Sequence, residues 1–375
     1  MKDSKRMKIL FYCGGFAPVG GVETFCKNLL THLKTKHHNC TLLCWGQKSP
    51  LLKSTQDIGV TIVRNPWRWG CIWNVPDWLL LPTGLKQIQH ADVVLFGKLF
   101  PLQILKLIRA QAGAKKRMVF ITSSRPTTPD NYLEKKHLLE ALNVFDLILV
   151  QSSLFIESLH HIGYKGRIEV LPLPHYYGTV KPLPVKELKI GFLGRLVKEK
   201  NVPLILEAFR CFQQKYLKEF MPADGQTQPS LHLFGDGYLR QELEQLTREL
   251  EISNSVIFHG NIPYDQIEDA IASCHLFVFA SHIEGQCLAA LEILSCGRPL
   301  VATDAGALPD ILSDSRLGKL VEYVHPENFA NSVMETVKLI NEQSMTPESI
   351  RSAYLERYEP KQISDRYIEI LNSLN

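Results

Sequence analysis

Short apolar runs alternate with amphipathic stretches along almost the whole chain of 375 residues. Runs rich in Val, Ile and Leu that recur between helix-like segments predict parallel strands buried on both faces. In the first half we expect strands over 8–12, 40–44, 60–63, 93–96, 118–121, 147–150 and 168–171, and helices over 21–33, 102–111, 133–143 and 153–161. This alternation predicts an α/β fold of doubly wound, Rossmann-like sheets.

The alternation stops at residues 172–186, which hold four prolines and show no periodicity. Proline fixes φ and removes a backbone donor, so we expect a linker here. Beyond it we expect strands over 188–193, 231–234, 256–259, 276–279, 299–302 and 319–321, and helices over 202–218, 239–250, 264–272, 288–296, 328–341 and 360–374. The sequence therefore predicts an N-terminal domain (1–180), a C-terminal domain (187–355) and a C-terminal helical segment (356–375).

Composition narrows the class of protein. Hydrophobic residues make up 45% and charged residues 21% of the chain, as in soluble globular proteins. No apolar run approaches the roughly 20 residues that span a bilayer, and the basic N-terminus leads into a short run that ends in glycines. We therefore expect a first strand rather than a signal peptide, and a cytoplasmic protein. The nine cysteines are scattered without a CxxC pair, which favours buried thiols over a disulfide framework or a metal site.

Charge is distributed unevenly between the two halves. Residues 1–180 hold 23 Lys and Arg against 11 Asp and Glu, whereas residues 181–375 hold 19 against 27. Such a split favours an anionic partner for the first half, either a phospholipid surface or a phosphorylated acceptor. An uneven spread of solvated lysines explains it equally well. A nucleic-acid partner is not expected, because no basic run is interleaved with aromatic residues.

Two loops that follow predicted strands carry candidate ligand-binding groups. Gly194 ends one strand and is followed by Arg195 and Lys200, two cations near a helix start that suit a diphosphate. Gly235 and Gly237 follow the next strand and leave its backbone open to a flat base or a sugar. Taken alone, each loop is also explained without a ligand, the first by ordinary surface charges and the second by a plain turn.

The segment 280–306 carries the strongest signal. Glu284 and Glu292 are eight residues apart, about two helical turns, and Glu292 interrupts an otherwise apolar helix face. A carboxylate there needs a partner for its desolvated charge, and ribose or hexose hydroxyls serve as well as a neighbouring Arg or Lys. Between the two acids, we expect the N–H groups at the helix start to hold a phosphate; this stretch is Gln286, Cys287 and Leu288.

These motifs together resemble the retaining glycosyltransferases of family 4, which have the GT-B fold. The resemblance covers nearly the whole chain and rests on a G-R-x₃-E-K element (Gly194, Arg195, Glu199, Lys200), an E-x₇-E element (Glu284, Glu292), a small-residue turn with a following acid (Ala305, Gly306, Asp310), a glycine-rich loop (Gly20, Gly21) and the VLPLP stretch at 170–174. It implies two Rossmann-like domains that face a central cleft. It also implies a final helix that crosses back onto the N-terminal domain.

The resemblance further implies a role for each matching residue. Arg195 and Lys200 would bind the donor diphosphate, and Gly21 would present its N–H to the phosphates. Glu284 would contact the donor sugar and Glu292 the ribose, while the backbone at Gly235 and Gly237 would border the base. Retention in this family uses front-face attack, in which the leaving phosphate helps to deprotonate the acceptor. No metal and no cofactor beyond the nucleotide-sugar, UDP- or GDP-linked, are implied.

The sequence departs from the family pattern at several positions. Ser123 or Ser124 stands where members often have a His that contacts the donor sugar. Cys287 replaces a common glycine, and Asp310 replaces a Glu. These departures put the identity of the transferred sugar in doubt.

The acceptor is less well defined. Four tryptophans in the segment 65–78 (Trp67, Trp69, Trp73, Trp78) suit a sugar-stacking wall or a membrane-interface contact, and the packing of a long loop explains them equally well. We expect a glycan or lipid-linked acceptor, with peripheral contact at the cytoplasmic face of the membrane.

The leading hypothesis is retaining transfer of a hexose from a nucleotide-sugar to a glycan or glycolipid hydroxyl, as in polysaccharide biosynthesis. A catalytically silent sugar-nucleotide-binding protein and a sugar-nucleotide epimerase remain alternatives. A NAD-dependent oxidoreductase is disfavoured, because neither half shows GxGxxG after its first strand.

Overall fold

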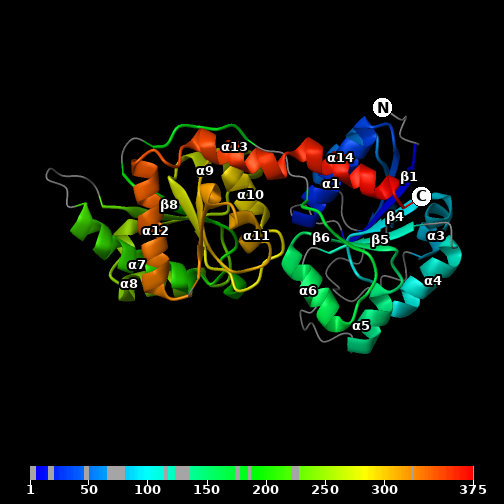
Figure 1. Cartoon of the computed structure of the whole chain (residues 1–375), viewed down its shortest axis with the longest axis horizontal. Helices are drawn as coiled ribbons and strands as arrows, with labels where there is room; N and C mark the ends of the chain where they lie inside the picture. The colour runs from blue at the N-terminus through cyan, green and yellow to red at the C-terminus, as the bar shows by residue number, and fades with distance from the viewer. Residues whose placement is uncertain are drawn as a thin grey trace. The chain divides into compact units, whose positions relative to one another are not determined.

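The structure is a computed structural model that describes residues 6–15, 21–45, 50–65, 81–113, 117–122, 135–173, 178–184, 187–220, 228–322 and 324–374. The chain divides into two compact units, labelled by element in Figure 1. Unit 1 comprises Met1–Tyr176 and Glu359–Asn375, and unit 2 comprises Tyr177–Tyr358. The division falls inside the proline-rich segment, and each unit is described by itself.

Unit 1 contains a seven-stranded sheet in the order β3-β2-β1-β4-β5-β6-β7, with every strand pair parallel. Its strands are β1 (Lys8–Gly15), β2 (Asn39–Trp45), β3 (Thr61–Asn65), β4 (Val93–Phe96), β5 (Arg117–Ile121), β6 (Leu147–Val150) and β7 (Ile168–Val170). β4 and β6 have the predicted bounds, and β1 runs three residues further than expected. The sequence-based prediction of a parallel α/β sheet is confirmed.

The helices of unit 1 are α1 (Gly21–Thr35), α2 (Pro50–Asp57), α3 (Leu81–His90), α4 (Leu102–Ala112), α5 (Lys135–Leu142), α6 (Ser153–Ile162) and α14 (Pro360–Asn372). α2 and α3 were not expected from the sequence. α3 contains both a proline and a glycine, residues that disfavour helix interiors. Packing explains the glycine, because a Cβ at Gly84 would lie 2.9 Å from Leu43 Cδ2 on the sheet.

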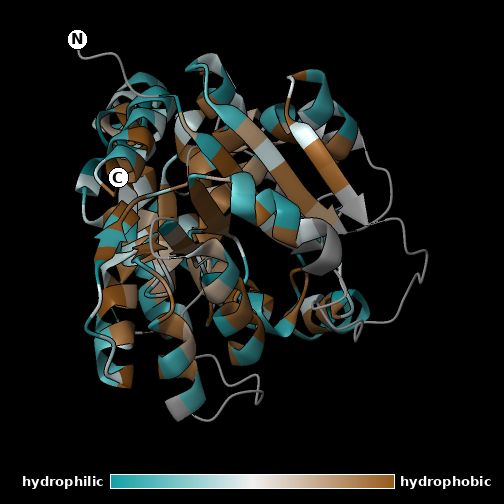
Figure 2. Ribbon diagram, turned by 90° about the vertical axis from the view of Figure 1, so that its right-hand side faces the viewer, coloured by the Kyte–Doolittle hydropathy of each residue, from teal (hydrophilic) through white to brown (hydrophobic). Residues whose placement is uncertain are grey.

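The strands form the core, as their composition requires. In Figure 2 they are largely brown, while the helices carry teal and brown on different sides. One face of the unit 1 sheet packs an aromatic cluster in which Tyr12 stacks on Phe100 at 4.4 Å between ring centroids and Phe120 stacks on Phe145 at 5.3 Å. Burying both faces makes near-continuous apolar strands stable.

The last helix of the chain, α14, packs against α1 within unit 1. The ring of Tyr367 is fully buried and lies 6.1 Å from that of Phe25. Asp365 accepts a hydrogen bond from His32 Nε2 at 3.0 Å and pairs with Lys36 Nζ at 2.9 Å. Burial opposes ionisation of Asp365, but these partners outweigh it and lower its pKa to about 2. The end of the chain is thus fixed to its beginning by apolar and ionic contacts.

Unit 2 contains a six-stranded sheet in the order β10-β9-β8-β11-β12-β13, again parallel throughout. Its strands are β8 (Lys189–Leu193), β9 (Ser230–Phe234), β10 (Val256–Gly260), β11 (Leu276–Phe279), β12 (Leu300–Thr303) and β13 (Gly318–Val321). Its α-helices are α7 (Val202–Glu219), α8 (Arg240–Glu249), α9 (Ile267–Ala272), α10 (Leu288–Ser295), α11 (Leu308–Leu312), α12 (Pro326–Asn341) and α13 (Pro347–Tyr358). The helix expected over 264–272 begins as a 3-10 turn, and α11 and α13 were not expected.

A buried arginine holds the part of the proline-rich segment that lies in unit 2 against the rest of that unit. Arg298 has no exposed surface, and its guanidinium donates to the backbone oxygens of Lys181 and Pro182, each at 2.8 Å. It also donates to three carbonyls elsewhere in unit 2, at Ala272, Cys274 and Cys296. Five carbonyl oxygens therefore share one cation in place of water.

Two histidines form a stacked, hydrogen-bonded pair on β9 and β10. His232 Nδ1 lies 2.9 Å from His259 Nε2, and His232 Nε2 lies 3.0 Å from Ser230 Oγ. Burial lowers the pKa of His232 to about 4, with a smaller effect of His259 and then of Lys189. Burial and Lys189 also lower the pKa of His259. Both rings are therefore neutral at neutral pH.

None of the helices in the described part of the chain combines the length and the apolar character needed to cross a membrane.

We predict that Arg298→Met lowers the free energy of unfolding by about 3 kcal/mol or more, because buried carbonyls lose their donor. Urea unfolding followed by circular dichroism measures the change. Arg316→Met is the control, since Arg316 is exposed and pairs with Asp314 and Glu356 at the surface. An equal loss in both variants would contradict this role of Arg298.

We also predict that acid destabilises unit 2 through His232. The pKa of His232 falls from about 6.5 unfolded to about 4 folded, so the unfolded chain binds more protons between these values. The free energy of unfolding should decrease as pH falls from 6.5 to 4, by at most about 1.4 kcal/mol per pH unit. Urea titrations across this range should show a shallower slope for His232→Gln and an unchanged slope for the exposed His161→Gln.

Candidate active site

The order of the unit 2 strands determines where a ligand site can form. From β8 the chain moves outward to β9 and β10, and from β11 it moves the other way to β12 and β13. The direction reverses between β8 and β11, which pair side by side. In open parallel sheets the loops that leave the carboxyl ends of such strands border a crevice. Here these loops are residues 194–201 and 280–287.

Lys200 and Glu284 meet at this reversal point. Lys200 belongs to a 3-10 turn, η2 (Lys198–Lys200), and its Nζ lies 2.5 Å from Glu284 Oε1. Ser281 Oγ donates to the same Oε1 at 2.8 Å. The Glu284 side chain is 7% exposed and that of Lys200 is 19% exposed. The structure therefore brings together two of the predicted site residues in a largely desolvated ion pair.

Hydrogen bonds with two neighbouring segments hold the loop that carries Glu284. His282 N–H donates to Glu199 O at 2.9 Å, and Thr303 Oγ1 donates to Ser281 O at the same distance. Gly306 has a φ of +57°, and a Cβ there would lie 2.4 Å from Glu284 O. The small-residue turn at Gly306 thus lets β12 and its loop approach the backbone of the acid.

A second backbone contact explains the two glycines after β9. Gly235 has a φ of +137°, and a Cβ there would lie 1.9 Å from Gly194 O. A Cβ at Gly237 would lie 2.2 Å from Leu196 O. The sequence interpretation, open backbone for a base or sugar, omitted this requirement. The glycines are needed because the loops after β8 and β9 pack backbone to backbone.

Arg195 lies between Gly194 and Leu196 in the loop after β8. Its side chain is exposed and forms no ion pair with any carboxylate in the described residues. It follows Gly194 in the loop that ends at Lys200, so both cations leave the same strand end. The structure shows Arg195 as a solvent-facing cation, unlike Lys200.

The start of α10 lies directly after Glu284. Cys287 precedes Leu288 with a φ of +56° and makes no side-chain cap to the first turn. Burial raises the pKa of the Cys287 thiol, and the charge of Glu284 raises it further. Gln286 is buried, and Glu292 is half-buried two-thirds of the way along the helix. A neutral thiol therefore occupies a left-handed backbone position, which favours glycine.

Several predicted residues lie outside the described residues. They are Gly20, Ser123, Ser124 and the tryptophans of the segment 65–78. Gly21 is the first residue of α1. Ser281 and Thr303 were missed by the sequence interpretation. Ser281 lies two residues after β11 and Thr303 is the last residue of β12, and small polar residues are common at such positions.

Comparisons with known proteins agree with this geometry. Residues 179–351 match the family model of glycosyl transferases group 1, and residues 19–174 match that of glycosyltransferase family 4. The chain is 23% identical over 246 residues to the poly(ribitol-phosphate) alpha-N-acetylglucosaminyltransferase of Staphylococcus aureus, which covers 64% of this chain and 46% of that protein. It is 28% identical over 186 residues to the alpha-monoglucosyldiacylglycerol synthase of Streptococcus pneumoniae, covering 49% and 39%. The matched stretches thus span less than half of these relatives.

Solved structures match over nearly the full length. HepE from Anabaena, in complex with UDP and glucose, has a TM-score of 0.75 at 17% identity and covers 98% of this chain and 100% of its own. Sucrose-phosphate synthase from Thermosynechococcus elongatus has a TM-score of 0.76 at 15% identity, covering 98% and 99%. At these identities the likeness establishes the fold. Because two family models together match both halves and the sheets match GT-B structures, the chain belongs to the family 4 glycosyltransferases and has the GT-B fold.

Proposed function

We propose that this protein transfers a hexose from a UDP- or GDP-sugar to a hydroxyl of a glycan or glycolipid, with retention of the anomeric configuration. The observation that carries the proposal is the pairing of Lys200 with Glu284 at the strand reversal of unit 2. Family membership supports the reaction class. HepE, whose structure was solved with UDP and glucose, supports a nucleotide-sugar as donor.

The ion pair offers two kinds of contact to such a donor. The side chain of Lys200 is 19% exposed, so a diphosphate can reach it, and the neighbouring Arg195 adds a second cation. A carboxylate such as that of Glu284 accepts hydrogen bonds from sugar hydroxyls, and Ser281 fixes its orientation. The same short loops therefore supply a cation for the leaving group and an acceptor for the sugar.

In the proposed reaction, negative charge develops mainly on the leaving diphosphate. The bond between the anomeric carbon and the diphosphate oxygen breaks, and the acceptor oxygen bonds to that carbon on the same face. The acceptor proton passes to the departing diphosphate, so a nucleoside diphosphate is released. Negative charge grows on the diphosphate as this happens, and Lys200 and Arg195 stabilise it there.

We predict that Lys200→Ala and Glu284→Ala each abolish slow donor hydrolysis or lower it about 100-fold or more, the usual effect of removing one charge-stabilising group. The measurement is release of free UDP or GDP from a panel of UDP- and GDP-hexoses. Any donor that the wild-type protein turns over also identifies the base and the sugar.

Lys198→Ala is the matched control, since Lys198 lies in the same 3-10 turn and is exposed. Its activity should remain near wild type. Because a partner of a buried ion pair is lost, circular dichroism must show that both test variants are folded. Tight donor binding by the wild-type protein without turnover, with acceptors supplied, would favour the silent sugar-nucleotide-binding protein instead.

We predict that Glu292→Gln raises KM for the active donor about 10-fold or more, because a charge-assisted hydrogen bond to the ribose is lost. The wild-type protein should discriminate against the matching 2′-deoxyribose donor by a similar factor. The variant should discriminate much less. If both proteins discriminate equally between the ribose and the 2′-deoxyribose donor, Glu292 does not contact the ribose.

A further inference from the structure

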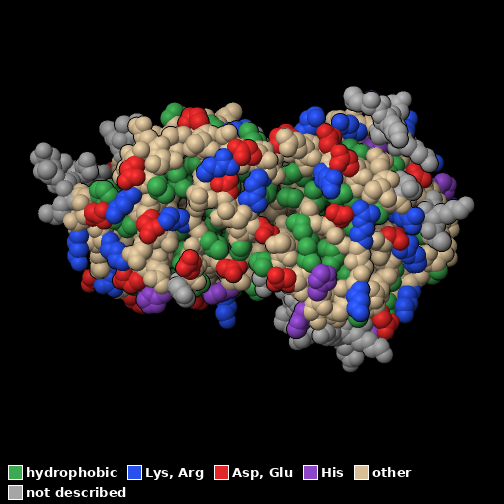
Figure 3. Space-filling model, in the orientation of Figure 1, with side chains coloured by type: hydrophobic (Ala, Val, Ile, Leu, Met, Phe, Trp, Pro, Cys, Tyr) green, Lys and Arg blue, Asp and Glu red, His purple; other side chains and the backbone are tan. Residues whose placement is uncertain are grey.

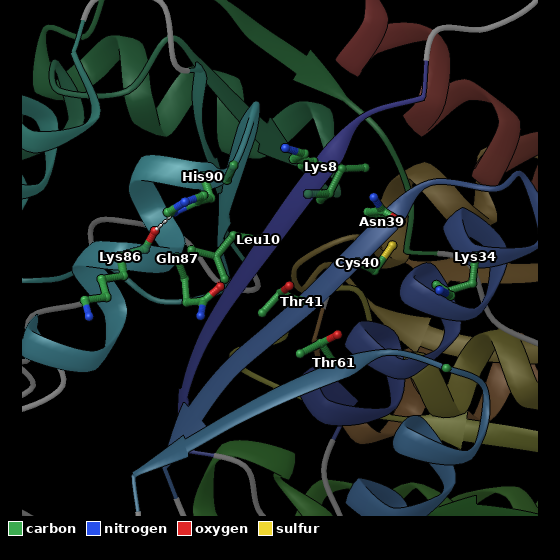
Figure 4. A pocket seen from close by; sticks show the side chains of 13 residues that line it. Lys8, Leu10, Lys34, Asn39, Cys40, Thr41, Thr61, Lys86, Gln87 and His90 are labelled. Atoms are coloured by element: carbon green, nitrogen blue, oxygen red, sulfur yellow. Dashed lines mark hydrogen bonds between the residues drawn. The ribbon is translucent and has the colours of Figure 1, made fainter.

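Unit 1 contains a cavity of about 490 Å³ at the amino ends of β1, β2 and β3. Figure 4 shows it from close by. Its wall is formed by the strand ends, the last turns of α1 and α3, and the turn before β3, through Lys8, Ile9, Leu10, Lys34, Asn39, Cys40, Thr41, Gly59, Thr61, Lys86, Gln87, His90 and Ala91. The carboxyl ends of these strands, where α/β enzymes place their chemistry, lie at the opposite edge of the sheet.

The strand register brings polar groups together on one side of the sheet. Lys8 pairs with Asn39, and Leu10 pairs with Thr41, which in turn pairs with Thr61. Register partners in parallel strands point to the same face, so the two hydroxyls are neighbours. Figure 4 shows α3 opposite them, with Gln87 and His90 on its near side. The cavity thus has hydroxyl and amide donors along its floor and wall.

The charge of the lining is one-sided. Lys8, Lys34 and Lys86 line the cavity, and no Asp or Glu is among the lining residues. Within the described part of the chain, no carboxylate forms an ion pair with any of these three lysines. Asp92 lies next to the cavity, but its Oδ2 accepts a hydrogen bond from Lys8 N–H at 2.8 Å. An anion that enters the cavity meets the lysine ammonium groups and no carboxylate among the lining residues.

The lysines of the cavity differ in setting from scattered surface charges. On the face drawn in Figure 3, Lys and Arg side chains are mixed with Asp and Glu. Lys8, Lys34 and Lys86 are instead among the residues that line one concave space, together with Thr41, Thr61 and Asn39. Concavity with several convergent polar groups is typical of a small-molecule site.

We propose that this cavity binds a phosphate-bearing anion, either a phosphorylated small molecule or the phosphate headgroup of a lipid. Phosphate oxygens accept from ammonium, hydroxyl and amide donors, which are the groups that line the cavity. The site accounts for part of the basic excess of the first half of the chain. It is independent of Lys200, Glu284, Arg195 and Glu292, the residues argued above for the transfer reaction, which lie in unit 2.

The test compares pyrophosphate binding by the wild-type protein and by Lys8→Gln/Lys34→Gln, using equilibrium dialysis. The double variant should bind about tenfold more weakly or worse, a loss of about 1.4 kcal/mol or more. The control, Lys106→Gln/Lys165→Gln, removes the same charge from exposed positions outside the cavity and should bind as the wild type does. All three proteins keep any other pyrophosphate site on the chain. The difference in binding between the two double variants therefore measures binding in the cavity.

A second variant tests the space rather than the charge. Thr61→Tyr keeps all the cations, suits an edge strand and fills part of the cavity, so it should weaken pyrophosphate binding as well. A flotation assay with vesicles of phosphatidylcholine, with and without phosphatidic acid, forms the lipid arm.

The outcomes separate the two sources of phosphate. Loss of pyrophosphate binding in both variants supports a soluble ligand. Flotation with phosphatidic acid that the variants lose, without soluble binding, supports a lipid headgroup. If the variants match the wild-type protein in both assays, or if the wild-type protein binds in neither, the proposal is overturned.

Discussion

All strands of each sheet run in the same direction, and this constraint determines where the chemistry of unit 2 is found. Parallel strands bring their carboxyl ends to one edge of a sheet, so loops far apart in sequence meet there. The strand order reverses between β8 and β11, and open parallel sheets form a crevice at such a reversal. Lys200 follows β8, and Glu284 follows β11 some eighty residues later, yet their charged atoms are in contact. The ion pair is therefore a consequence of topology as much as of side-chain chemistry.

Much of the fold was predictable because the buried strands carry a strong compositional signal. β4, β6 and β11 were predicted with their observed bounds. Each is a run of four apolar residues, which is typical of a strand buried on both faces of a parallel sheet. The helices that were missed have weaker signals. α11 is five residues long, and α3 contains a glycine whose reason is a contact with Leu43 from another part of the chain. Local sequence does not report such a contact.

The candidate site divides along similar lines. The charged residues Lys200 and Glu284 were predicted from the combined G-R-x₃-E-K and E-x₇-E elements, because the loop that carries Lys200 is, taken alone, also explained by ordinary surface charges. The glycines were also identified, but their reason was not, since only the structure shows Gly235 against Gly194 O and Gly306 against Glu284 O. Ser281 gave little signal, as a serine after a strand is common. The cavity of unit 1 was foreshadowed only as an excess of lysines, because its shape depends on three strands and two helices together.

The contact of α14 with α1 has a consequence for how the protein is made. Unit 1 includes both ends of the chain, and unit 2 is an insertion between them. During synthesis, unit 2 emerges from the ribosome complete, whereas unit 1 must wait for the final helix to cover Phe25 and supply Asp365 to His32 and Lys36. Within this sequence, the segment that precedes unit 2 thus completes its packing only after unit 2 has been made.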